Sequence, residues 1–133
     1  GLTADAYHIT APHPEGLGAK AAMELAKVTY DVTAVAMLSN DDDSLALQMR
    51  NAATQVPVNV AEGASHKVSE EAIELLFEAR HYIYELETLT YLAAMLNQIS
   101  PDQQSQLLEQ VDTSRKLLFG FIKHFKRPKE AHE

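Results

Sequence analysis

The chain has 133 residues, a length that indicates one domain large enough to bury most of its apolar surface. Hydrophobic residues make up 46% and charged residues 23%, which excludes extensive disorder, and the absence of cysteine excludes disulfides, thiol nucleophiles and thiolate zinc sites. The formal charge of −8 argues against a protein covered in nucleic acid, because binding phosphates requires cations.

The first segment, residues 1–16, is predicted to be an extended or mobile lead because it contains Pro12, Pro14 and Gly16. It lacks the basic and apolar regions of a signal peptide, and no apolar run approaches the ~20 residues that span a bilayer. Together with the missing cysteines, these features lead us to expect a cytoplasmic protein with no membrane contact.

Four segments then carry the spacing of amphipathic helices, and β-hairpin signals are missing between them. Their approximate bounds are 17–38, 43–61, 69–97 and 100–128. The last opens with Ser100-Pro101-Asp102-Gln103, a capping box with proline at the first helical position. Short connections make neighbouring helices antiparallel, so we predict an all-α, up-down antiparallel four-helix bundle over residues 17–127, followed by a tail at 128–133.

The second predicted helix contains the unusual stretch QVPVNVAEG, residues 55–63. Pro57 removes a backbone donor and should kink this helix. Gly63 allows either close packing or a helix end, and Asn59 and Glu62 lie three residues apart on one side. We interpret the stretch as a shaped helix end that satisfies its own polar groups rather than as a binding site.

The third predicted helix is too apolar for a single buried face. One stripe runs through residues 75, 79, 82, 86, 89, 93 and 96, and a second runs beside it through Ile73, Phe77, Tyr84 and Tyr91. Two explanations stay open. The helix lies deep in a well-filled bundle, or the second stripe forms a subunit interface, where tyrosine is favoured.

The same helix carries acidic residues and a Glu-x-x-His motif, Glu78 to His81. Di-iron bundles need this motif on two helices, with a further glutamate from each of the others, and here it occurs once. Glu74, Glu78 and Glu85 therefore indicate a solvated acidic face, and we expect no metal, no cofactor and no catalytic residue. A carboxylate-bundle metalloenzyme is the third and weakest functional hypothesis.

Basic residues gather at the other end of the chain. Residues 1–114 hold 5 basic and 17 acidic side chains, whereas residues 115–133 hold 6 basic and 2 acidic ones. Five of these cations fall on roughly one side of the fourth helix: Arg115, Lys116, Lys123, Lys126 and Arg127. They indicate either a solvated helix end that complements the helix dipole or a strip that binds phosphates, with Arg50 and Lys67 as weaker contributors.

Two stretches resemble a known family. These are LQMRNAATQVPVNVAEGASHKVSEE, residues 47–71, and ARHYIYELETLTYLA, residues 79–93. The chain resembles the four-helix bundle proteins encoded in 23S rRNA intervening sequences, a family with a related branch of accessory proteins in diversity-generating retroelements. The family pattern matches Pro57, Asn59, Ala61, Glu62, Gly63, Glu85, Leu86 and Thr88, which we take as structural.

The resemblance implies a ring-like homo-oligomer, most simply a pentamer, and a non-enzymatic role connected with structured RNA or a ribonucleoprotein. The leading hypothesis is thus a non-catalytic oligomeric scaffold that contacts RNA through the basic strip of the fourth helix. The alternative is a protein-interaction module that uses the acidic face of the third helix.

Overall fold

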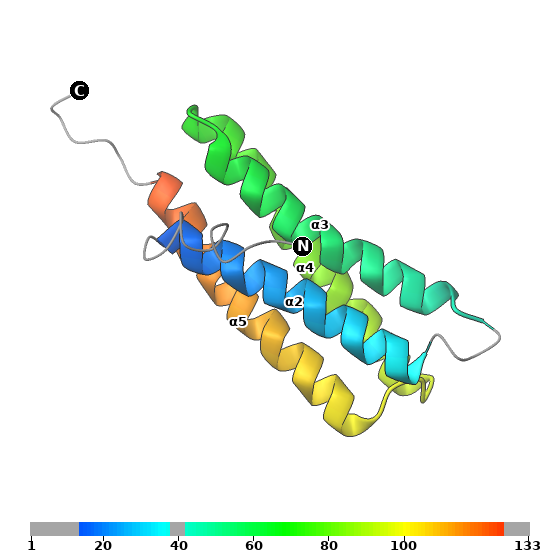
Figure 1. Ribbon diagram of the computed structural model, residues 1–133. Helices are drawn as coiled ribbons and strands as arrows, with labels where there is room; N and C mark the ends of the chain where they lie inside the picture. Colours follow the sequence, from blue (N-terminus) through cyan, green and yellow to red (C-terminus); the bar gives the residue numbers. More distant parts are fainter. Residues whose placement is uncertain (1–13, 38–41, 127–133) are drawn as a thin grey trace, which may run out of the picture.

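The computed structural model describes residues 14–37 and 42–126, and within them the chain forms four α-helices and no strand. They are α2 (Pro14–Ala36), α3 (Ser44–Ser65), α4 (Ser69–Met95) and α5 (Pro101–Lys126). Each helix packs against the next one in the chain, and α5 returns to pack against α2. Figure 1 shows the four helices side by side. The predicted all-α up-down four-helix bundle is confirmed.

The helix bounds differ from the predicted ones by a few residues. α2 begins at Pro14, so residues 14–16 belong to the bundle and not to the predicted lead. Proline is well tolerated in a first helical turn, where no intrahelical donor is needed. α3 continues to Ser65, four residues past the predicted end. Residues 1–13 and 127–133 lie outside the described part of the chain.

The connection from α4 to α5 is fixed by two local motifs. At the end of α4, Asn97 has a φ of 59°, and the amides of Asn97 and Gln98 donate to the carbonyls of Ala94 and Ala93. This is a Schellman motif, and asparagine suits its left-handed position. At the start of α5, the Ser100 amide donates to Gln103 Oε1 (2.8 Å) and the Gln103 amide donates to Ser100 Oγ (3.1 Å). The predicted capping box is present.

Pro57 lies inside α3, and the helix continues through it. The ribbon of α3 changes direction near its middle in Figure 1, in agreement with the predicted kink. Asn59 is half-buried and donates its Nδ2 to the carbonyl oxygen of Gln55 at 2.8 Å. The polar side chain therefore bonds to its own helix, as our interpretation of this stretch required.

The core is apolar and is shared by all four helices. Its largest fully buried side chains include Leu25, Met49, Leu76, Leu107 and Phe121. The buried hydroxyls of Thr29, Thr33 and Thr90 each donate to the carbonyl four residues earlier, at 2.8 Å. Because these polar groups are paired locally, they carry little cost of burial.

Gly63 marks a close approach of α3 to α4. It is buried, and a Cβ placed on it would lie 3.0 Å from Leu76 Cδ2 and 3.3 Å from the Ala72 carbonyl oxygen. Gly63 does not end the helix, because α3 continues to Ser65. Of the two predicted roles, close packing is the one that the structure supports.

The second apolar stripe of α4 is only partly covered by the bundle. Ile73 and Phe77 are half-buried, whereas Tyr84 is 47% exposed and Tyr91 48% exposed. Full burial within a single bundle is therefore wrong for the C-terminal half of this stripe. None of the four helices has the length and apolar character needed to cross a membrane.

Candidate functional site

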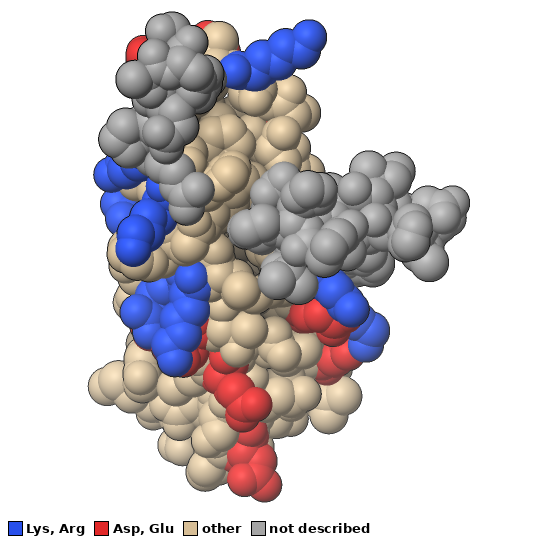
Figure 2. Space-filling view, turned by 90° about the vertical axis from the view of Figure 1, so that its left-hand side faces the viewer, with Lys and Arg blue, Asp and Glu red and all other residues tan. Residues whose placement is uncertain are grey.

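The predicted basic strip lies on the solvent-facing side of α5. Lys116, Lys123 and Lys126 are exposed and Arg115 is half-exposed, while Arg127 lies outside the described residues. Along a helix that rises about 1.5 Å per residue, the strip from Arg115 to Lys126 is about 16 Å long. Figure 2 shows several Lys and Arg side chains along its left-hand edge, with others at the top and on the right.

Asp112 partly neutralises the first turn of the strip. It forms ion pairs with Arg115 Nη2 and with Lys116 Nζ, the latter at 2.9 Å. The hydrogen bond from Lys116, together with that from Arg115, holds the pKa of Asp112 below its ordinary value, so the residue is a carboxylate at neutral pH. Among the described residues, the ion pairs include neither Lys123 nor Lys126.

A groove between α4 and α5 adjoins these cations. It has a volume of about 330 Å³ and is lined by Arg80 and Tyr84 of α4 and by Arg115, Lys116 and Phe119 of α5. Phe119 is 64% exposed, an unusual position for a large apolar side chain. The groove thus combines three cations with two aromatic rings that the bundle does not cover. We call these five residues the α4/α5 groove.

Phe77 connects the groove to the end of α5. The Arg80 guanidinium carbon lies 4.6 Å from the centre of the Phe77 ring, and Lys126 Nζ lies 5.1 Å from the same centre. Both distances fit cation–π contacts. Lys126 and Arg80 are therefore neighbours although they come from different helices, and the basic surface spans two helices rather than one.

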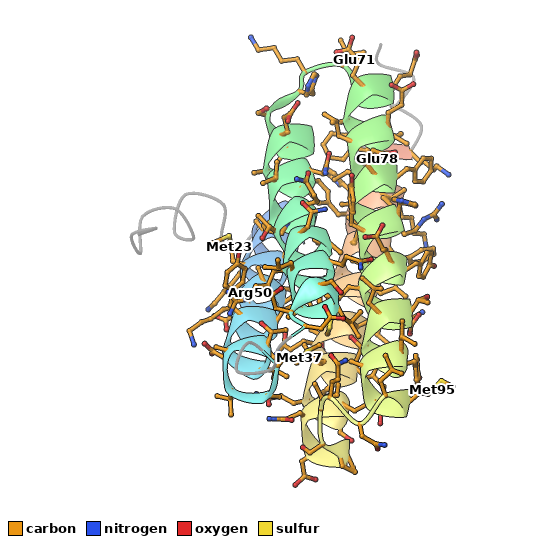
Figure 3. The ribbon with its side chains drawn as sticks, turned by 90° about the vertical axis from the view of Figure 1, so that its right-hand side faces the viewer. Met23, Met37, Arg50, Glu71, Glu78 and Met95 are labelled. Carbon is orange, nitrogen blue, oxygen red and sulfur yellow. The ribbon has the colours of Figure 1, made fainter. Side chains whose placement is uncertain are left out.

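The two weaker basic candidates lie elsewhere. Arg50 packs α3 against α2: its Nε donates to Thr33 Oγ1 (2.7 Å), its Nη2 donates to the Tyr30 carbonyl oxygen (3.0 Å), and its guanidinium covers the Tyr30 ring at 4.2 Å. Figure 3 shows Arg50 between these two helices. Lys67 is exposed in the turn between α3 and α4. Neither residue lines the groove.

The residues matched by the family pattern are spread over the bundle. Gly63 and Leu86 are buried and Pro57 is half-buried, which agrees with a structural role. Ala61, Glu62 and Thr88 are exposed, so burial in the bundle does not explain their match to the pattern. Glu85 is half-exposed, and its Oε1 lies 3.9 Å from His81 Nε2.

The acidic face of α4 is open to solvent, with Glu71, Glu74 and Glu78 all exposed. Figure 3 shows Glu71 and Glu78 along this helix. Within residues 14–37 and 42–126, no three histidine, aspartate or glutamate side chains come together as metal ligands. The exposure of these glutamates agrees with a solvated acidic face.

Sequence reasoning missed three residues of the groove: Arg80, Tyr84 and Phe119. Tyr84 was assigned to the second apolar stripe, and Phe119 lies four residues after Arg115 and so on the same side of α5. That spacing was a usable signal for Phe119. The position of Arg80 opposite the α5 strip depends on how α4 and α5 align, which no local pattern reveals.

Comparison with known proteins agrees with this architecture. A crystal structure from Bacteroides thetaiotaomicron, of a protein with unknown function from the S23 ribosomal protein family, has a TM-score of 0.78 and 17% sequence identity. The match covers 83% of this chain and 98% of that one, and at this identity it shows the fold alone. No curated protein matches the sequence. Residues 18–120 match the profile of the 23S rRNA-intervening sequence proteins, and the chain therefore belongs to that family.

Proposed function

We propose that this protein is a non-catalytic scaffold that contacts structured RNA, or the RNA of a ribonucleoprotein, through the basic surface of α4 and α5. The observation that carries the proposal is the meeting of cations from two helices: Arg80 from α4 joins Arg115, Lys116 and Lys126 from α5. Phosphate binding depends on such clusters, and it tolerates a negative net charge when the acids lie on other faces.

The distribution of acids supports this assignment. Three exposed glutamates of α4, Glu71, Glu74 and Glu78, fall on a different side of that helix from Arg80 and Tyr84, by the 3.6-residue period. Exposed Glu70 and half-buried Glu87 fall closer to that pair. Asp112 is the acid that the ion pairs place against the strip, and it faces two cations. Most of the exposed acids of α4 thus lie away from the groove, so the net charge of −8 does not describe the groove itself.

The test measures binding to a labelled RNA hairpin with a loop of about eight nucleotides. Fluorescence anisotropy gives the affinity at each of a range of salt concentrations. Affinity should fall steeply with salt, with a log–log slope of about −3 for four or five neutralised phosphates. The double charge reversal Lys123→Glu with Lys126→Glu should weaken binding by about tenfold or more at low salt and reduce the slope by about 1.4.

The matched control reverses two exposed lysines of α2, Lys20→Glu with Lys27→Glu, which changes the net charge by the same amount. This control should weaken binding far less, because a local strip rather than total charge determines the contact. If both double variants weaken binding equally, or if wild-type affinity does not depend on salt, direct RNA contact by this surface is wrong.

The acidic face of α4 supports a second role, docking of a basic protein partner. Partners retained after nuclease treatment, and lost when Glu74 and Glu78 are changed to glutamine, would favour that role.

Self-association is a separate expectation. It rests on the family resemblance and on the second apolar stripe of α4, and the exposed side chains of Leu92 and Met95 add apolar surface near the end of the helix. The mass of the protein in solution tests this expectation and the predicted ring.

A further inference from the structure

The α4/α5 groove holds more than a phosphate strip requires. Backbone phosphates need cations alone, yet the groove also exposes the rings of Tyr84 and Phe119 beside Arg80, Arg115 and Lys116. Exposure of a large aromatic ring to water is unfavourable. Two such rings in one groove therefore indicate a surface that becomes covered. The cations at the edge of the groove specify an anionic occupant.

Four classes of occupant have to be compared. A basic peptide is opposed by the three cations, and a purely apolar segment would leave them without partners. A nucleic-acid duplex keeps its bases stacked inside the helix, out of reach of the two rings. A single-stranded segment offers phosphates to the cations and a flat base face to each ring, so it satisfies both kinds of group at once.

We propose that the α4/α5 groove binds an unpaired nucleotide of RNA, with the base stacked on Tyr84 or Phe119 and the flanking phosphates held by Arg80, Arg115 and Lys116. The proposal rests on the proposed RNA contact and gives it a preferred target: loops, bulges and ends rather than paired stems. The groove volume of about 330 Å³ lies at the lower end of the range for small-molecule sites, which suits an occupant of about one nucleotide.

The extension of the cationic surface past the groove fits the same target. Lys126, near the C-terminal end of α5, and Arg80 both contact the Phe77 ring. A strand leaving the groove in that direction would keep its phosphates close to Arg80, Lys126 and Lys123. Stacking of this kind tolerates any base, so we expect preference for unpaired RNA without strong sequence preference.

The test compares two labelled RNAs, the hairpin with an eight-nucleotide loop and a fully paired duplex of the same stem. The wild-type protein should bind the looped RNA about tenfold more tightly. Tyr84→Leu with Phe119→Leu keeps the apolar side chains and every charge but removes both rings. It should lower affinity for the loop by about tenfold and affinity for the duplex by less than twofold.

Two further measurements identify stacking itself. A 2-aminopurine placed in the loop should lose fluorescence when the wild-type protein binds and keep it with the leucine pair. The ring-retaining pair Tyr84→Phe with Phe119→Tyr should bind at least fivefold more tightly than the leucine pair. Tyr91→Leu removes an equally exposed ring of α4 outside the groove and should leave loop affinity within twofold.

The outcomes separate this proposal from the proposed function. If the charge reversals at Lys123 and Lys126 weaken binding but the leucine pair binds both RNAs like the wild type, unpaired-base recognition is wrong and RNA contact stands. If the wild-type protein binds neither RNA, both proposals are wrong. Circular dichroism of each variant is the control, and it should show that substitutions at these exposed positions leave the helices intact.

Discussion

The two seams that flank α4 differ in almost every respect. Against α3, the helix packs so closely that a Cβ on Gly63 would lie only 3.0–3.3 Å from Leu76 and the Ala72 carbonyl oxygen. Against α5, the same helix borders an open groove of about 330 Å³ lined by arginine, lysine, tyrosine and phenylalanine. Both seams join antiparallel neighbours linked by short turns.

On our proposal, one helix divides structural and binding roles between its two sides. Small residues at a seam let backbones approach and exclude solvent, which contributes to stability. Long cationic and aromatic side chains keep the outer part of a seam open, which leaves their charged and π surfaces for another molecule. The seam with α3 should therefore control folding, and the seam with α5 should control binding.

The strongest test of the close seam is Gly63→Leu. The added side chain would collide with Leu76 and the Ala72 carbonyl, and overpacking in a filled site costs about 3 kcal/mol, including shifts of the backbone. Chemical denaturation should show this loss as a lower midpoint with a similar slope.

The matched control is Gly120→Leu, at an exposed position of α5 where an added Cβ meets nothing within 4 Å. Leucine is the better helix former there, so stability should rise by about 0.8 kcal/mol. Equal effects at the two glycines would mean that the seam with α3 is not tightly packed.

This pair of glycines also shows what the sequence can and cannot predict. The sequence predicts that Gly63 either packs closely or ends a helix. The position of Leu76, thirteen residues later, decides between these two roles. The capping box at Ser100 and Gln103 was predictable in full, because all its atoms lie within four residues. Local chemistry thus predicted the elements, their order and the bundle.

The candidate site was predictable only in part for the same reason. The α5 cations follow from helical spacing on one segment. Their neighbours Arg80 and Tyr84 come from α4, and their alignment with Arg115 and Phe119 depends on the whole core. Arg50 was grouped with the cations because its partners on α2, Tyr30 and Thr33, are 20 and 17 residues away.

Arg50 sharpens the comparison between a cation used in packing and cations left for binding. Arg50→Ala removes two hydrogen bonds to α2 and the contact with the Tyr30 ring, so unfolding free energy should fall by about 1.5 kcal/mol. Arg50→Lys keeps the charge but loses the planar donor pair, and it should recover only part of that loss.

The affinity of both Arg50 variants for the looped RNA should stay within twofold of the wild type, measured at a temperature where all are folded. A loss of affinity as large as that of the reversals at Lys123 and Lys126 would contradict the packing role and return Arg50 to the RNA-binding surface.

The smallest predicted effect concerns Asp112, the carboxylate that faces the groove cations. Its pKa is lowered by the hydrogen bond from Lys116 and, with a smaller effect, that from Arg115. The folded state thus favours the carboxylate, so its contribution to stability is present above the ordinary aspartate pKa and is lost as the pH falls through the lowered one. Because all three groups are exposed to solvent, Asp112→Asn should change stability very little at any pH.

RNA affinity should rise with Asp112→Asn, whereas the other variants should lower it or leave it nearly unchanged. Asp112→Asn releases Arg115 and Lys116 from their ion pairs and leaves both cations for phosphates. Affinity for the looped RNA should therefore rise about threefold at low salt, and the salt dependence should steepen by about 0.7 for each phosphate gained. Glu109→Gln, three residues earlier on α5, makes the same change of charge at an exposed position that does not line the groove. A gain with Asp112→Asn that exceeds the gain with Glu109→Gln would show that Asp112 limits RNA binding through its two ion pairs, whereas equal gains would show that only the total charge matters.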